Sequence, residues 1–121
     1  MSAKRILIIE DEQALLEAYT LLFRTKQYEV FQAANGRDAI PILEREKPDY
    51  IILDILMPIM GGIEFLEIVH IAETYPDTKV LVLSNLSDQK TLENVMRLGA
   101  SRYMLKASAS PRELIEAVEA L

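Results

Sequence analysis

The sequence contains no cysteine, and it has only four glycines and five prolines among 121 residues. The lack of cysteine excludes a disulfide framework, a thiol nucleophile and a cysteine-based zinc site. The small share of glycine and proline, with no internal repeat, argues against a low-complexity chain. No apolar run approaches the roughly 18 residues of a membrane span, and the run at residues 6–9 is too short for a signal peptide. We therefore predict a cytoplasmic protein with no membrane contact.

Positive charge is also scarce. The chain has 13 Lys and Arg against 19 Asp and Glu, so its formal net charge is -6. Phosphate contacts to nucleic acid need clustered Lys and Arg, and direct binding of nucleic acid is therefore disfavoured. Half of the residues are hydrophobic, which is enough for a real core. The length suits one domain over residues 1–121.

Five short apolar runs, typical of strands buried on both faces, alternate with amphipathic segments typical of helices. The strands are predicted at residues 6–9, 28–31, 50–53, 79–83 and 102–105. The helical stripes lie at residues 15–23, 38–46, 63–72, 92–96 and 114–121. This alternation predicts an α/β fold, a three-layer αβα sandwich around a flavodoxin-like, doubly wound (βα)5 parallel sheet with strand order 2-1-3-4-5.

Single residues refine the limits of the helices. The pair Ser87-Asp88 is expected to cap the fourth helix and Gly99 to end it, while Ser110, which precedes a proline, is a good cap for the fifth. Pro41 lies inside the second stripe, so that helix should start late or kink. His70, the only histidine, falls one position past the inward stripe of the third helix and is expected at the surface or boundary.

Polar residues stand where the predicted strands end. Glu10 and Asp11 follow the first strand, Asp54 the third, Ser84 the fourth and Lys106 the fifth. Each has an ordinary explanation: a cap, a helix-start acid, a turn residue or a solvated lysine. In a parallel sheet of this order, however, all five lie on one edge, with the first and third strands adjacent. Their joint occurrence therefore indicates a site.

This set of side chains suits phosphoryl chemistry. Three carboxylates repel one another and need a cation, and hard oxygen ligands suit Mg²⁺ or Mn²⁺. Asp54 would be the nucleophile, since a carboxylate can attack phosphorus and form an acyl phosphate. Lys106 and the metal would neutralise the charge on the phosphoryl oxygens, and Ser84 could donate a hydrogen bond to one of them.

The motifs ILIIEDE, PDYIILDILMPIMGG, VLVLSN and GASRYMLK resemble the receiver domain of bacterial two-component response regulators, also called CheY-like, and the resemblance covers residues 4–121. It implies that Asp54 is the phosphoacceptor in phosphorelay signal transduction. It also implies Mg²⁺ bound by Asp11, Asp54 and the main-chain carbonyl of Leu56, with Glu10 acting through water. Ser84 and Tyr103 are then the switch pair.

The resemblance also implies partners. The phosphoryl donor would be a sensor histidine kinase or a histidine phosphotransfer protein. Switching would change the face of the fourth helix, fifth strand and fifth helix for a downstream effector or a fused output domain. Such a domain is not an enzyme beyond catalysing its own phosphorylation and slow self-dephosphorylation. The chain would be a stand-alone receiver or a piece of a larger regulator, and a homodimer through the fourth and fifth helices is compatible with the sequence but not signalled by it.

Four positions bear on departures from the family pattern. Ala107 replaces a proline that often follows the lysine in a cis peptide; a cis Lys-Ala bond would cost about 3 kcal/mol, so a trans or strained loop is expected. Asn85 replaces a small residue, which narrows access to the phosphoryl group. Leu56 and Leu86 occupy positions that tune phosphoryl lifetime, and because neither can position an attacking water, slow self-dephosphorylation is predicted.

Three alternatives were weighed against the receiver interpretation. A haloacid-dehalogenase-like phosphatase would have Asp-x-Asp after the first strand, whereas Asp54 follows the third and Leu56 stands two positions on. A flavodoxin-like cofactor binder would need a phosphate loop where this chain has EDEQ. A receiver fold that is never phosphorylated and serves only as a protein-interaction module stays open, because of Ala107 and Asn85.

Overall fold

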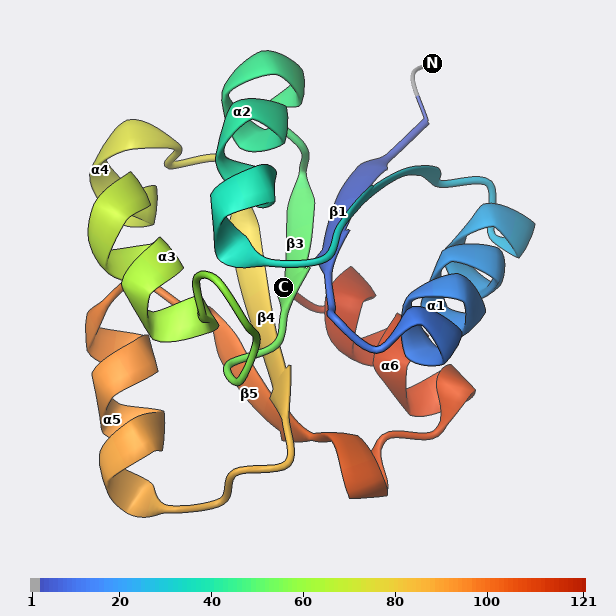
Figure 1. Ribbon diagram of the computed structural model, residues 1–121. Coiled ribbons are helices and arrows are strands. Elements are labelled where there is room, and N and C mark those ends of the chain that lie inside the picture. Colours follow the sequence, from blue (N-terminus) through green and yellow to red (C-terminus); the bar gives the residue numbers. More distant parts are fainter. Residues whose placement is uncertain (1–2) are drawn as a thin grey trace.

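The computed structural model describes residues 3–121 and shows one parallel sheet between two layers of helices (Figure 1). The strands are β1 Arg5–Ile9, β2 Glu29–Ala33, β3 Tyr50–Leu53, β4 Lys79–Ser84 and β5 Arg102–Leu105, in the order β2-β1-β3-β4-β5. The helices are α1 Gln13–Thr25, α2 Gly36–Glu46, α3 Gly62–Val69, α4 Ile71–Thr74, α5 Gln89–Arg97 and α6 Pro111–Glu119, with a 3-10 turn at Lys106–Ser108. The predicted αβα fold and strand order are confirmed.

The three central strands, β1, β3 and β4, are mostly apolar because both faces of the sheet are covered there. Leu7 and Ile9 pack towards α2, α3 and α5, whereas Ile6 and Ile8 pack towards α1 and α6. All four are completely buried. Figure 1 shows the two helix layers on opposite sides of the sheet. No helix formed by residues 3–121 is long and apolar enough to cross a membrane.

The predicted helix caps are confirmed. Asp88 accepts a hydrogen bond from the main-chain N–H of Thr91 at 3.0 Å. Ser110 forms a capping box with Glu113 before a proline in the first turn of α6. Gly99 follows the end of α5 with φ +109°, a conformation that glycine adopts without strain. These three helix ends are thus fixed by local chemistry.

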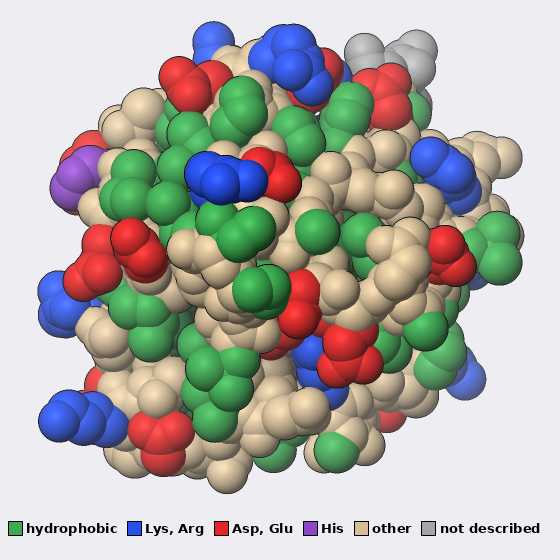
Figure 2. All heavy atoms as spheres, viewed as in Figure 1, with side chains coloured by type: hydrophobic (Ala, Val, Ile, Leu, Met, Phe, Trp, Pro, Cys, Tyr) green, Lys and Arg blue, Asp and Glu red, His purple; other side chains and the backbone are tan. Residues whose placement is uncertain are grey.

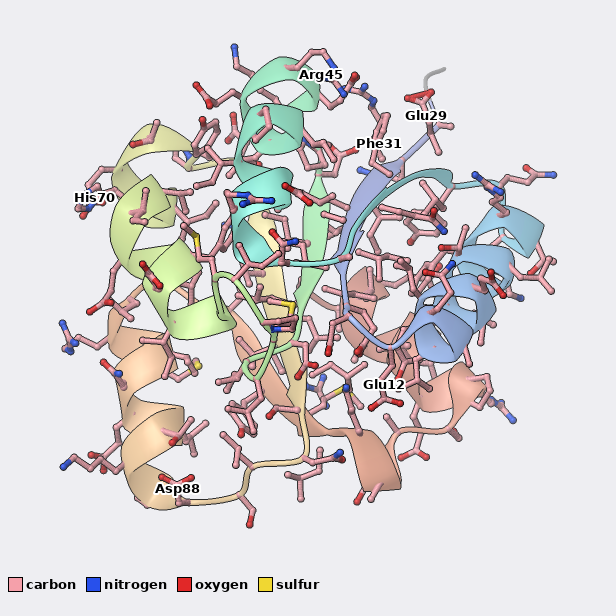
Figure 3. All side chains as sticks on the ribbon, viewed as in Figure 1. Glu12, Glu29, Phe31, Arg45, His70 and Asp88 are labelled. Carbon is pink, nitrogen blue, oxygen red and sulfur yellow. The ribbon has the colours of Figure 1, made fainter. Side chains whose placement is uncertain are left out.

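The third helix differs from the prediction, because the stripe at residues 63–72 is interrupted. The residue after α3, His70, has a left-handed backbone (φ 49°), and α4 begins at Ile71. Ile71 is buried where the sequence pattern placed Ala72, which is exposed. A Cβ added to Gly99 would lie 2.5 Å from Ile71 Cγ2, so the backbone of that glycine makes room for the isoleucine. His70, labelled in Figure 3, is exposed, as expected.

The second helix begins earlier than predicted. α2 starts at Gly36, because Asn35 caps it by accepting from the main-chain N–H of Asp38 at 2.8 Å. Pro41 therefore lies inside the helix, and the expected late start is wrong. The proline faces solvent, where water can satisfy the carbonyl that loses its helical donor. The second strand also differs: it runs later than residues 28–31, over Glu29–Ala33.

A cluster of charged side chains lies at the end of the sheet where the strands begin, opposite their carboxyl ends. Arg5, at the start of β1, forms ion pairs with Glu29 of β2 and with Glu46 at the end of α2. Its guanidinium also lies 5.0 Å from the centre of the Phe31 ring. Figure 3 labels Glu29, Phe31 and Arg45 in this region, and Arg45 pairs with Glu46 at 2.8 Å. Three elements are thereby joined at this edge.

Candidate functional site

The carboxyl ends of the strands form one cavity of about 190 Å³. β1 and β3 are neighbours, with Ile9 opposite Leu53, so the residues that follow them emerge side by side. The cavity is lined by Asp11, Glu12, Asp54, Leu56, Ser84, Asn85 and Lys106. Figure 2 shows acidic and basic side chains next to one another below the centre of the face that Figure 1 presents. The predicted gathering of strand-end residues is observed.

The backbone around Asp54 is held on both sides. Its N–H donates to the Ile9 carbonyl at 3.1 Å, and its own Oδ1 accepts from the N–H of Ile55 at 2.8 Å. The loop then folds back, and the N–H of Gly62 donates to the Ile55 carbonyl at 2.9 Å. A Cβ at Gly62 would lie 2.3 Å from the Asp54 carbonyl oxygen, so only glycine permits this close approach. The Asp54 side chain is consequently buried in a fixed orientation.

Lys106 joins two of the carboxylates. Its Nζ lies 2.7 Å from Glu10 Oε1 and 3.1 Å from Asp54 Oδ2, and all three side chains are at least nine-tenths buried. Burial lowers the pKa of Lys106, but the hydrogen bonds to the two carboxylates outweigh it, and the pKa is raised. Burial raises the pKa of Glu10, against the opposing hydrogen bonds from Lys106 and from the main-chain N–H of Glu12. The lysine therefore stays charged in this site.

The carboxylates also fit a divalent cation. Glu10, Asp11 and Asp54 each offer an oxygen, and these oxygens lie within 4.8 Å of one another. Glu10 and Asp54 are buried and Asp11 is exposed, so the group has one open side through which a cation and its water can enter. Such a donor set suits Mg²⁺ or Mn²⁺. Leu56 lines the same cavity.

Ser84 and Tyr103 are linked through the backbone of Leu86. The Leu86 N–H donates to Ser84 Oγ at 3.1 Å, and the Tyr103 hydroxyl donates to the Leu86 carbonyl. Ser84 is buried and Tyr103 is half-buried against the core. Burial raises the pKa of Tyr103, and the nearby Ser84 hydroxyl opposes this rise. The residues predicted as a pair are thus connected through the main chain of one residue in the loop after β4.

One of the two positions predicted to tune the phosphoryl lifetime lies away from the cavity. The side chain of Leu86 packs against the core and is not among the cavity's lining residues, whereas Leu56 is 65% exposed and lines it.

Within residues 3–121 every peptide bond is trans, so the Lys106–Ala107 bond takes the trans form and enters the 3-10 turn. Of the two expectations for this loop, the trans form is confirmed.

Two main-chain contributions to the site could not be predicted from the sequence. The N–H of Glu12 donates a hydrogen bond to Glu10 Oε2 at 3.1 Å. The main-chain N–H and carbonyl of Leu86 connect Ser84 with Tyr103. Both act through backbone atoms, which every residue type carries, so no sequence pattern reveals them. Glu12, labelled in Figure 3, lies at the start of α1 beside the cavity.

Comparison with known proteins gives one consistent result. Residues 6–119 match the response regulator receiver domain family. The chain is 37% identical over 117 residues to the transcriptional regulatory protein DegU of Brevibacillus brevis, covering 95% of this chain and 48% of DegU. It is 29% identical over 106 residues to sporulation initiation phosphotransferase F of Bacillus subtilis, covering 88% of this chain and 84% of that protein.

A solved structure agrees. The CheY-like response regulator receiver domain protein from Methanospirillum hungatei superposes with a TM-score of 0.91 at 28% identity, covering 98% of this chain and 93% of that one. The chain spans about half the length of the first transcriptional regulatory relatives that it matches.

Proposed function

Since the chain belongs to the response regulator receiver domain family, whose members act in phosphorelay signalling, we propose that it accepts a phosphoryl group on Asp54. The observation that carries this proposal is the placement of a buried, oriented Asp54 beside Lys106 at 3.1 Å and beside two further carboxylates. A carboxylate in this setting has a nearby cation and room for a ligand of phosphoryl size.

The transfer begins with a phosphohistidine on the donor protein. An oxygen of Asp54 attacks phosphorus, the new O–P bond forms, and the P–N bond to the imidazole breaks. The imidazole nitrogen leaves with the electron pair and takes a proton from water. Lys106 balances charge on the phosphoryl oxygens, and the Ser84 hydroxyl donates to one of them. A bound Mg²⁺ or Mn²⁺, held by Glu10 through water, Asp11, Asp54 and the Leu56 carbonyl, would supply further neutralisation of this charge.

Phosphorylation would be read out through Ser84 and Tyr103. When the Ser84 hydroxyl turns to a phosphoryl oxygen, the Leu86 N–H loses its acceptor and the loop before α5 is freed to move. Because the Tyr103 hydroxyl is hydrogen-bonded to the Leu86 carbonyl, the Tyr103 side chain moves with that loop. The surface of α5, β5 and α6 changes as a result. We propose that a downstream effector or a fused output domain binds there.

We further propose that the domain acts in the cytoplasm, where the phosphoryl donor would be a sensor histidine kinase or a histidine phosphotransfer protein. Residues 1–121 would form a single receiver domain, on its own or within a longer regulator, and a homodimer is compatible with it. The domain would catalyse only its own phosphorylation and a slow self-dephosphorylation, because Leu56 at the cavity cannot orient a water.

Intact mass spectrometry tests the proposal. The protein is incubated with Mg²⁺ and acetyl phosphate, and we expect the mass of one added phosphoryl group. Asp54→Ala should abolish the gain, whereas the matched control Asp77→Ala, at an exposed position far along the chain, should retain it. A wild-type protein that gains no mass and binds no Mg²⁺ would instead be a protein-interaction module that is never phosphorylated.

A further inference from the structure

We propose that the side-chain amide of Asn85 donates a hydrogen bond to the phosphoryl group on Asp54. This inference rests on the proposed function and deepens it by adding a residue that contacts the phosphoryl group. It replaces the expectation that Asn85 merely narrows the entrance.

Asn85 lies at the mouth of the cavity. It follows Ser84, the last residue of β4, and lines the same cavity as Asp54 and Lys106. Its side chain is exposed. Within residues 3–121, the side-chain hydrogen bonds of this loop are made by Ser84 and Asp88, so the Asn85 amide remains available to a ligand.

The other side-chain donors of the cavity can serve only part of a phosphoryl group. Lys106 Nζ already contacts Glu10 and Asp54, which leaves one of its three N–H donors, and Ser84, whose Oγ accepts from the Leu86 N–H, has a single hydroxyl hydrogen to donate. A phosphoryl group brings three terminal oxygens, each a strong acceptor, and more negative charge than the carboxylate it replaces. A neutral amide adds hydrogen bonds to these oxygens without drawing Lys106 away from Glu10. Asn85 is therefore suited to the part of the phosphoryl group that faces the mouth.

The size of the cavity argues against a purely steric role. Its volume of about 190 Å³ is measured with Asn85 in place as part of the lining. A water molecule occupies about 30 Å³ in the liquid, so the cavity has room for several waters, and hence for a phosphoryl group. The cavity therefore still has room for a phosphoryl group when Asn85 is present, and the Asn85 amide offers that group a polar contact.

Two substitutions separate a donor from a spacer. Asn85→Ala removes both the amide and its bulk, and Asn85→Leu removes the amide but keeps a similar size. If Asn85 is a donor, both variants should be phosphorylated by acetyl phosphate about three- to tenfold more slowly than wild type. If it acts by size, Asn85→Ala should react faster, and that result would overturn the inference. Ser87→Ala, two residues on and exposed, is the matched control.

An equilibrium measurement supplies a second readout. Beryllium trifluoride mimics a phosphoryl group on a carboxylate, and its binding in the presence of Mg²⁺ can be followed by fluorine NMR. We expect both Asn85 variants to bind it several-fold more weakly than wild type and Ser87→Ala to bind it equally well. Equal or tighter binding by Asn85→Ala would overturn the role of Asn85 but leave the proposed phosphorylation of Asp54 intact. A wild-type protein that shows no Asp54-dependent binding or phosphorylation would overturn the proposed function itself.

Discussion

The ammonium of Lys106 lies 2.7 Å from a carboxylate oxygen of Glu10, although the two residues follow strands that are not neighbours. Lys106 follows β5 and Glu10 follows β1, with β3 and β4 between them in the sheet. The lysine side chain therefore spans the carboxyl edge of the sheet and supplies a positive charge to a buried acidic group.

Replacing this lysine should weaken the fold in a way that a cation can repair. Lys106→Met leaves Glu10 and Asp54 buried without their partner, so the free energy of unfolding should fall by about 3 kcal/mol. Millimolar Mg²⁺ should recover part of the loss, since it supplies the missing charge and binds only the folded state. Urea unfolding with and without Mg²⁺ measures both effects. Lys90→Met, at an exposed position on α5, should match the wild type both with and without Mg²⁺, and an unchanged stability of Lys106→Met would contradict the prediction.

The lifetime of the acyl phosphate should depend on Leu56 more than on Leu86. Leu56→Asn places an amide at the cavity that can orient an attacking water, and we expect decay to accelerate about tenfold or more. The Leu86 side chain packs against the core, so Leu86→Glu should have a smaller effect. Loss of the phosphoryl mass with time gives both rates. Unchanged lifetimes in the two variants would refute the link between these positions and slow dephosphorylation.

Ile59 should be a source of backbone strain. It has φ +70°, a region that β-branched residues rarely adopt, and its side chain is 63% exposed. Ile59→Asn should raise the free energy of unfolding by about 1 kcal/mol, because asparagine tolerates this conformation and little burial is lost. Ile68→Asn is the control, since Ile68 is also exposed but lies in α3. A gain for both variants, or for neither, would show that strain at residue 59 is not the cause.

Alkaline stability should report the burial of Tyr28. Burial raises the pKa of this phenol from 10.0 to about 12, so between these values the folded state holds a proton that the unfolded state has lost. Stability should therefore fall as pH rises above 10. Tyr28→Phe keeps the edge-on contact with Phe23, whose ring centre lies 5.2 Å away, but cannot ionise. Above pH 10, the free energy of unfolding of the wild type should therefore fall relative to that of Tyr28→Phe by about 1 kcal/mol per pH unit. A difference that stays constant up to pH 11 would contradict it.

The fold and the gathering of the strand-end side chains could be predicted because their signals are local. A short apolar run reveals a buried parallel strand, and a polar residue at its end marks the carboxyl edge, so Asp54, Ser84 and Lys106 could be placed together. The break at His70 could not, because it depends on the packing of Ile71 against the backbone of Gly99, which is distant in sequence. The roles of main-chain atoms likewise leave no trace in residue type.

Arg5 and its partners lie far enough from the Asp54 cavity to make their end of the sheet a suitable place for attaching a label. The arginine stands at the start of β1, and the Asp54 cavity lies at the other end of the same sheet (Figure 1). A strand of this length separates the two by about 16 Å. A fluorescent label or a surface tether attached ahead of β1 would thus emerge on the side of the molecule away from the cavity, and immobilised protein would keep that cavity open to donors and metal ions.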